Sequence, residues 1–211
     1  MRGLIDALRR ERVLPRAELA GLIREISDGD MPYLFDAARE TARSRFGNRI
    51  YTRGLIEFTN YCRCDCYYCG IRRGNRQAKR YRLTQEEILA CCRAGYALGF
   101  RTFVLQGGED PYFTDERICE LVRAIKSSWP DCAVTLSIGE KEHSSYRLYR
   151  KAGADRYLLR HETASPAHYR RLHPPEQTPQ RRRQCLWSLK ELGYQTGAGF
   201  MVGSPYQTPE N

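Results

Sequence analysis

The sequence predicts an α/β fold in which parallel strands form an incomplete (β/α) TIM-type barrel behind an N-terminal helical cap. Three observations support this fold. Short β-rich segments alternate with helical segments from Gly54 onward, helices end on a glycine that leads into the next strand at Gly99, Gly153 and Gly193, and polar residues follow nearly every strand. Strands separated by whole helices run parallel, and a barrel gathers functional residues after each strand. A doubly wound sheet, which concentrates such residues at one switch point, is the alternative.

The first part of the chain, residues 1–49, is predicted to contain helices only. Pro15 and Pro32 stand at first positions of helices, where a missing backbone N–H is tolerated, and Gly47 closes the third helix. We therefore expect a helical segment over residues 1–49 and a barrel segment, with five βα units, over residues 50–211.

The barrel segment is predicted to hold five strands, at residues 54–59, 101–106, 133–138, 156–160 and about 195–202. Thr84 begins a capping box for the helix after the first strand, Thr114 precedes an acidic first turn in the next, and Thr178 opens the last. A further helix is expected over residues 143–152. Because five parallel strands cannot close a barrel, we expect the chain to be the N-terminal part of a longer protein.

The charge and hydropathy of the sequence argue against a nucleic-acid-binding protein and a membrane protein. The 35 Lys and Arg residues against 25 Asp and Glu give a net charge of +10, with basic stretches at residues 72–82 and 181–183. Tyr81 is the only aromatic residue of the first stretch, so solvated faces that attract an anionic substrate or redox partner are favoured over a nucleic-acid site. No segment approaches the ~18 apolar residues of a membrane span, and the N-terminus lacks a secretory signal. We expect a cytoplasmic protein that binds neither nucleic acid nor membranes.

The cysteines point to a metal centre. The chain has nine, an odd number, and four of them lie between residues 62 and 69, which in a reducing compartment indicates metal ligands rather than disulfides. Cys62, Cys66 and Cys69 have the spacing C-x-x-x-C-x-x-C, which can hold three irons of a 4Fe-4S cluster and leave the fourth open. A zinc site that also uses Cys64 is the alternative, although four thiolates this close fit a tetrahedron poorly. Otherwise Cys64 is a bystander.

At these residues the chain resembles the radical S-adenosylmethionine (SAM) superfamily, whose signature is C-x-x-x-C-x-aromatic-C after the first strand. Tyr68 occupies the aromatic position, beside which the loop contacts the adenine of SAM in that family. The run Gln106-Gly107-Gly108-Glu109 follows the second strand, where the family's GGE motif binds the methionine amino group. The resemblance implies a 4Fe-4S cluster and SAM as cofactors, with no catalytic residue beyond them.

The same resemblance assigns residues after the later strands. Ser137 and Glu162 suit polar contacts to the ribose or methionine portion of SAM, and Met201 lies in a run that resembles the adenine-contacting strand. Arg160 and Arg181 suit the clamping of a substrate carboxylate by guanidinium forks. A solvated helix face explains Arg181 equally well.

Within the superfamily the chain resembles the HydE-type maturases of FeFe-hydrogenase. Six segments carry this resemblance: residues 54–62, 68–73, 104–113, 136–140, 157–163 and 197–206. Cys64 departs from the asparagine expected between the first two ligands. The implied function is radical cleavage of SAM in assembly of the hydrogenase di-iron subcluster. The implied partners are a small cysteine-bearing iron carbonyl cyanide precursor, a reduced electron donor such as ferredoxin or flavodoxin, and the other hydrogenase maturases.

Two alternatives remain at this point. One is another radical SAM enzyme of the same architecture, of the biotin synthase or methylornithine synthase type. The other is a basic iron–sulfur or zinc module that binds RNA and catalyses nothing, which the net charge of +10 and the cysteine loop support. Polar residues at the strand ends, and the absence of aromatic stacking platforms beside the basic stretches, argue against the RNA module.

Overall fold

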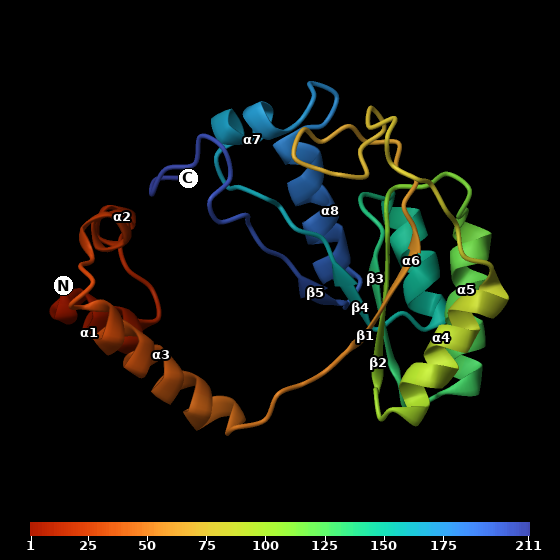
Figure 1. Cartoon of the computed structure of the whole chain (residues 1–211), viewed down its shortest axis with the longest axis horizontal. Helices are drawn as coiled ribbons and strands as arrows, with labels where there is room; N and C mark the ends of the chain where they lie inside the picture. The colour runs from red at the N-terminus through yellow and green to blue at the C-terminus, as the bar shows by residue number, and fades with distance from the viewer. The chain divides into compact units, whose positions relative to one another are not determined.

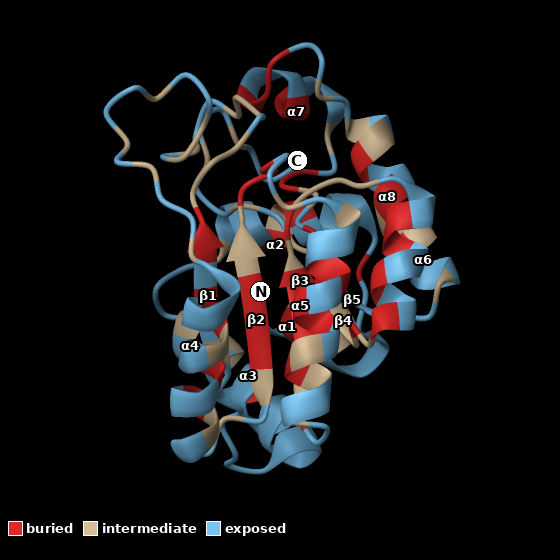
Figure 2. Cartoon of the chain, turned by 90° about the vertical axis from the view of Figure 1, so that its right-hand side faces the viewer, coloured by how far each residue is buried: buried red, intermediate tan, exposed pale blue.

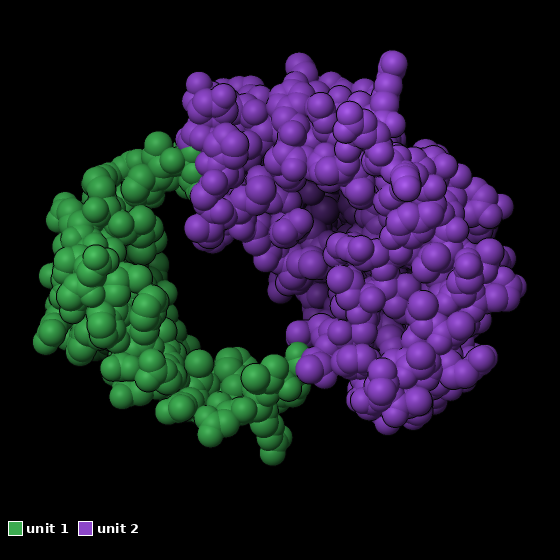
Figure 3. Space-filling view, viewed as in Figure 1, with its two compact units in different colours: residues 1–51, 207–211 green, residues 52–206 purple.

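The computed structural model describes all 211 residues, which separate into two compact units. One comprises residues 1–51 with residues 207–211, and the other comprises residues 52–206 (Figure 3). None of the helices combines the length and the apolar character that crossing a membrane requires.

The smaller unit is helical. It consists of α1 (Arg2–Glu11), α2 (Arg16–Glu25) and α3 (Met31–Phe46) around a small core that contains Ile5 and Leu22. Pro15 is the residue before α2 rather than its first, whereas Pro32 lies in the first turn of α3. The C-terminal residues join this unit, since the Glu210 carboxylate pairs with Arg24.

The larger unit is built on a five-stranded parallel sheet (Figure 1). Its strands are β1 (Gly54–Thr59), β2 (Thr102–Gly107), β3 (Ala133–Ser137), β4 (Arg156–Leu158) and β5 (Gln195–Gly197). They lie in the order β1-β2-β3-β4-β5, each paired in parallel with the next. The predicted α/β fold is confirmed. A strand order that follows the chain without reversal is that of a barrel segment, since a doubly wound sheet reverses its order at the switch point.

Helices cover one face of this sheet, in the order α4 (Gln85–Ala97), α5 (Asp115–Ser128), α6 (His143–Ala152) and α8 (Pro179–Glu191). Each contacts the next in this series, so they form one layer (Figures 1 and 2). The main core fills the space between sheet and helices, with Phe58, Phe103, Leu105, Leu136 and Tyr157 completely buried. The predicted capping box at Thr84 is present, and Thr114 caps α5.

The opposite face of the sheet carries polar side chains toward the ends of the strands. Successive side chains of a strand alternate between faces, so the residues next to the buried core positions point away from the helices. The pairing register aligns Glu57 of β1 with Gln106 of β2, and Gln106 with Ser137 of β3. These three polar residues therefore lie side by side on adjacent strands, near the strand ends.

The structure differs from the predicted elements at the last two strands. β4 ends at Leu158 and β5 at Gly197, although the backbones remain paired beyond them through the bonds from Leu159 N–H to Gly197 O and from Met201 N–H to Glu162 O. Glu162 forms an isolated parallel bridge with Phe200, and its φ of 66° lies outside the strand region. A further helix, α7 (Pro166–Leu172), is also present. Its signal is Ser165-Pro166, a capping serine before a proline at the first helical position.

Candidate functional site

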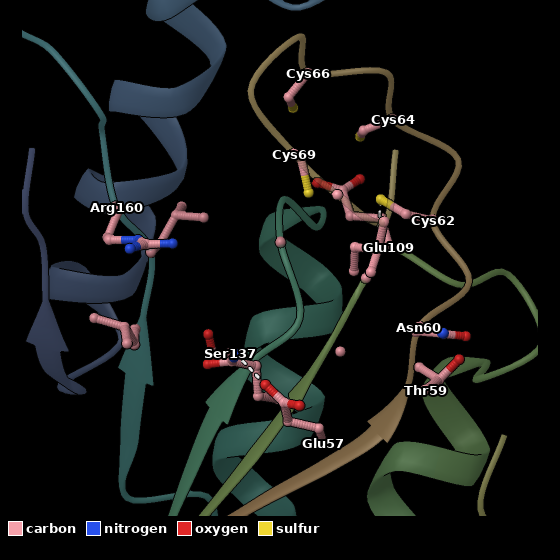
Figure 4. Close-up of a pocket in the computed structure, with 18 of the residues that line it drawn as sticks. Glu57, Thr59, Asn60, Cys62, Cys64, Cys66, Cys69, Glu109, Ser137 and Arg160 are labelled. Carbon is pink, nitrogen blue, oxygen red and sulfur yellow. Dashed lines mark hydrogen bonds between the residues drawn. The ribbon is translucent and has the colours of Figure 1, made fainter. Parts of the chain in front are cut away.

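The predicted metal ligands lie on one irregular loop that follows β1. Cys62, Cys64, Cys66 and Cys69 are all partly buried, and Figure 4 shows them gathered above the ends of the strands. Together with the strand ends they line a cavity of about 510 Å³. This edge of the sheet is where (β/α) barrels place their active sites.

Arg80 holds the cysteine loop closed. Its guanidinium donates hydrogen bonds to four backbone carbonyls: to Asn60 at a short distance, to Ile71 at 2.8 Å, to Arg72 at 2.7 Å and to Asn75 at 3.2 Å. The acceptors lie on both sides of the cysteines in sequence, so one side chain joins the beginning of the loop to its end. This role of Arg80 could not be predicted from the sequence, because a basic residue among many gives no local signal of its acceptors.

The thiols differ in how readily they ionise. The hydrogen bond from the Cys64 thiol, more than any other contact, lowers the pKa of Cys62 to about 6, while the same bond and burial raise the pKa of Cys64. Cys62 Sγ also accepts the backbone N–H of Glu109 at 3.3 Å. Burial raises the pKa of Cys66, whose thiol donates to Gln177 Oε1 at 3.3 Å. The thiolate is the metal-binding form of cysteine, and the lowered pKa favours this form at Cys62.

The Gly-Gly-Glu run after β2 packs directly on the cysteine loop. A Cβ on Gly108 would collide with the carbonyl oxygen of Tyr61 and would lie 2.6 Å from Cys62 Cβ, so only glycine permits this approach. Glu109 is 7% exposed, and both of its carboxylate oxygens are engaged: Oε2 by Arg63 at 3.0 Å and Oε1 by the backbone N–H of Glu140 at 2.7 Å. Glu109 thereby ties the loops after β1, β2 and β3 together.

Two adjacent arginines of α8 have different surroundings. Arg182 lines the cavity, donates to Glu140 Oε1 at 2.6 Å and to the Arg160 carbonyl at 3.0 Å, and its side chain is 9% exposed. Arg181, one of the two predicted carboxylate ligands, instead pairs with Glu142 at 2.6 Å and does not line the cavity. The missed signal is helical spacing, because Arg182 lies on the face of α8 that buries residues 185 and 189.

The predicted site residues as a whole divide into those that line the cavity and those that do not. Those that line the cavity are Cys62, Cys66, Tyr68, Cys69, Gln106, Gly107, Gly108, Glu109, Ser137, Arg160 and Glu162. Arg181 and Met201 do not. Figure 4 shows Arg160 facing the cysteines from the opposite side of the cavity, with Ser137 between them at the level of the sheet.

The donors present fit a 4Fe-4S cluster with a bound polar cofactor. No three His, Cys, Asp or Glu side chains converge on one position that could hold a single metal ion. In a cubane each thiolate binds a different iron, so three thiols spaced along one loop suit such a cluster. Glu162 adds an acceptor: it is 4% exposed, and its Oε2 is buried without a hydrogen-bond partner in the protein. A buried unpaired carboxylate oxygen in a cavity wall is expected to meet a donor from a ligand.

Comparison with known proteins identifies relatives of the chain. A family model for the radical SAM superfamily matches residues 56–211. The chain is 50% identical over 175 residues to the [FeFe] hydrogenase maturase subunit HydE of Thermotoga maritima, covering 83% of this chain and 49% of the relative. It is 30% identical over 188 residues to 3-methylornithine synthase of Methanosarcina acetivorans, covering 88% and 53%. The chain thus spans about half the length of these relatives.

Solved structures agree with the fold. The crystal structure of methylornithine synthase (PylB) matches with a TM-score of 0.87 and 30% identity, covering 95% of this chain and 59% of that one. The crystal structure of HydG, a maturase of the [FeFe]-hydrogenase, matches with a TM-score of 0.83 over 99% of this chain and 47% of that one. At 24% identity the second similarity concerns the fold alone.

Proposed function

Because this chain belongs to the radical SAM superfamily, we propose that it reductively cleaves SAM as a HydE-type maturase, in the assembly of the FeFe-hydrogenase di-iron subcluster. The observation that carries the proposal is the cavity at the strand ends. Three thiols at cluster spacing, Cys62, Cys66 and Cys69, form one wall, and the Gly-Gly-Glu run forms the wall beside it.

The two walls of the cavity would bind the cluster and SAM, respectively. Cys62, Cys66 and Cys69 would hold the cluster, and residues 106–109 would line the methionine end of SAM. A reduced 4Fe-4S cluster with an open iron supplies one electron that cleaves bound SAM to methionine and a 5'-deoxyadenosyl radical. The protein provides the orientation and the exclusion of water that such chemistry needs.

The charged groups of the cavity suit the zwitterionic amino-acid end of SAM or of a substrate. Arg160 is the available cation: its side chain is 61% exposed, and it approaches Glu162 Oε1 at only 3.5 Å. Arg182 is committed to Glu140, so we propose that it fixes the cavity wall. Arg181 would have to leave Glu142 before it could bind a carboxylate, and we therefore place Arg160 first as the carboxylate ligand.

The proposed partners are the small cysteine-bearing iron carbonyl cyanide precursor, a reduced electron donor and the other hydrogenase maturases. Surface charge supports an acidic donor, because Arg63, Arg73, Arg76 and Lys79 are exposed on or beside the cysteine loop. Complementary charge steers the encounter of redox partners. The similarity to the solved methylornithine synthase favours a related radical rearrangement as the second candidate. The RNA-binding alternative is not favoured.

The decisive experiment is anaerobic reconstitution with iron and sulfide, followed by reduction with dithionite in the presence of SAM. We expect 5'-deoxyadenosine, and we expect a cysteine-bearing iron carbonyl cyanide complex to be consumed at a matching rate. A methylornithine-type enzyme would release 5'-deoxyadenosine but would leave that complex unchanged. Protein that holds its full complement of iron yet releases no 5'-deoxyadenosine would refute the proposed function.

A further inference from the structure

The end of α7 and the segment that joins it to α8 contact three successive residues of the cysteine loop. The Tyr67 N–H donates to the Leu172 carbonyl at 2.9 Å, and the Tyr68 hydroxyl lies 3.1 Å from Nε2 of His173. The third contact joins Cys66 Sγ to the Gln177 side-chain amide at 3.3 Å. This third contact reaches the sulfur of a proposed ligand from outside the cysteine loop.

The backbone that carries the Gln177 side chain is held in place by its neighbours. The Gln177 N–H donates to the Pro174 carbonyl at 3.0 Å, and the next residue, Thr178, caps α8 by accepting the Arg181 N–H at 3.2 Å. On the other side, buried His173 stacks on the ring of Tyr169 with the centroids 3.8 Å apart. The backbone on both sides of Gln177 is therefore tied to α7 and α8, and Gln177 lines the cavity.

The direction of the hydrogen bond must reverse when the cluster is bound. In the free thiol Cys66 S–H is the donor and Gln177 Oε1 the acceptor. A thiolate ligand has no proton, so it can only accept, and a half-turn of the amide exchanges oxygen for NH₂ without moving the side chain. We propose that Gln177 donates an amide hydrogen bond to the Cys66 thiolate and thereby raises the reduction potential of the cluster. The inference rests on the cluster-binding part of the proposed function.

The rise in reduction potential follows from the negative charge that the cluster gains on reduction. Reduction adds one electron from an external donor to the cluster, with no proton, so the cluster and its thiolates become more negative. A hydrogen-bond donor at a ligand sulfur stabilises that added charge and raises the potential. Cys62 already accepts a backbone N–H, that of Glu109, and no change of the Glu109 side chain other than to proline would remove this donor. Gln177 supplies the corresponding bond from a side chain, and a substitution can therefore test it.

The test is a redox titration of the reconstituted chain followed by EPR, in the absence of SAM. Gln177→Leu removes the donor, and Gln177→Glu replaces it with an acceptor that carries negative charge. In the Leu variant we expect the ratio of reduced to oxidised cluster at a fixed potential to fall about tenfold, a shift of ~59 mV for one electron. The Glu variant should shift at least as far. Gln180→Leu, which changes an exposed glutamine in the first turn of α8, should match the wild type.

A measurement on the wild type covers the case in which the variants lose their cluster. Protein with ¹⁵N in its glutamine side chains should show a ¹⁵N coupling to the reduced cluster by pulsed EPR, and the coupling should persist in Gln106→Leu, the other cavity glutamine. Wild-type potentials in both Gln177 variants, or a wild-type cluster without the coupling, would overturn the inference. A wild type that assembles no cluster would refute the proposed function instead, so the two failures are distinguishable.

Discussion

Arg82 and Asp110 form a bidentate ion pair that joins the segment before α4 to the loop after β2. Nε and Nη2 of Arg82 lie 2.7 and 2.9 Å from the two carboxylate oxygens. Asp110 is 2% exposed and also accepts the Thr59 hydroxyl at 2.7 Å. The guanidinium lies 3.9 Å from the centroid of the Tyr61 ring, next to Cys62, a proposed ligand of the cluster. The pair therefore links the segment before α4 to Thr59 and to the residue after Glu109, and both Thr59 and Glu109 line the cavity.

Substitution of Arg82 should destabilise the chain. Arg82→Leu leaves a buried carboxylate without its cation, which costs about 3 kcal/mol of unfolding free energy. The measurement is urea unfolding of the cluster-free protein. Arg101→Leu is the matched control, because Arg101 also pairs with an aspartate and lies over a tyrosine ring, but at the surface. The control should lose less than about 1 kcal/mol, and equal losses would contradict the proposed support.

Acid should remove the contribution of Asp110. Burial alone would raise the pKa of this carboxyl, but the hydrogen bonds from Arg82 and Thr59 outweigh it and hold the pKa below the ordinary value of 3.8. A depressed folded-state pKa stabilises the fold above the unfolded-state pKa, and the contribution is lost as the pH falls through the folded-state pKa. The stability difference between wild type and Asp110→Asn should therefore be constant from pH 7 to about 5 and shrink below pH 4. A difference that does not change with pH would contradict the assignment.

The cysteines should separate into ligands and a bystander. Cys62→Ala, Cys66→Ala and Cys69→Ala should each abolish the cluster, whereas Cys64→Ala should retain iron and sulfide near wild-type content. Loss of the Cys64 thiol also removes the bond that lowers the pKa of Cys62, so reconstitution of this variant should be slower near neutral pH without a lower final iron content. Iron analysis and the visible absorption of the cluster measure both. A Cys64→Ala protein that cannot be reconstituted would overturn the ligand set.

Gly108 should tolerate no side chain. The Cβ of Gly108→Ala would strike the backbone of Tyr61 and the side chain of Cys62, so we expect loss of both cluster assembly and SAM binding, measured by iron content and calorimetry. Gly70→Ala is the control: this glycine lines the same cavity, but its added Cβ would meet nothing within 4 Å. Normal iron content and SAM affinity in Gly108→Ala would show that the loop can relax.

Much of the fold could be predicted from short sequence patterns. Thr84 and Thr114 mark their helices because capping depends on residues three positions apart, and the cysteine spacing is likewise contained within one loop. The irregular end of β4 could not be predicted, because the left-handed φ of Glu162 is imposed by its pairing with the chain after β5. Gln177 was missed for a similar reason, since it meets Cys66 from 111 positions away. Such contacts exist only once the helices have packed.

Arg80 is the strongest case of a role visible only in three dimensions, and it leads to the last prediction. Lys has one nitrogen and cannot reach four carbonyls at once, so Arg80→Lys should leave the ends of the cysteine loop free to separate while it keeps the charge. We expect normal secondary structure and faster loss of iron to a chelator, by about tenfold for ~1.4 kcal/mol of lost loop stability.

The control for Arg80 is Arg76→Lys, an exposed position in the same loop, which should lose iron at the wild-type rate. Guanidinium ion at concentrations too low to unfold the protein should partly restore iron retention to Arg80→Ala, because it offers planar donors to the vacated carbonyls, whereas methylammonium should not. This rescue distinguishes loss of the bonds to the four carbonyls from a general loss of stability, which guanidinium would only worsen. If Arg80→Lys retained iron as long as Arg76→Lys, the loop would not depend on these bonds.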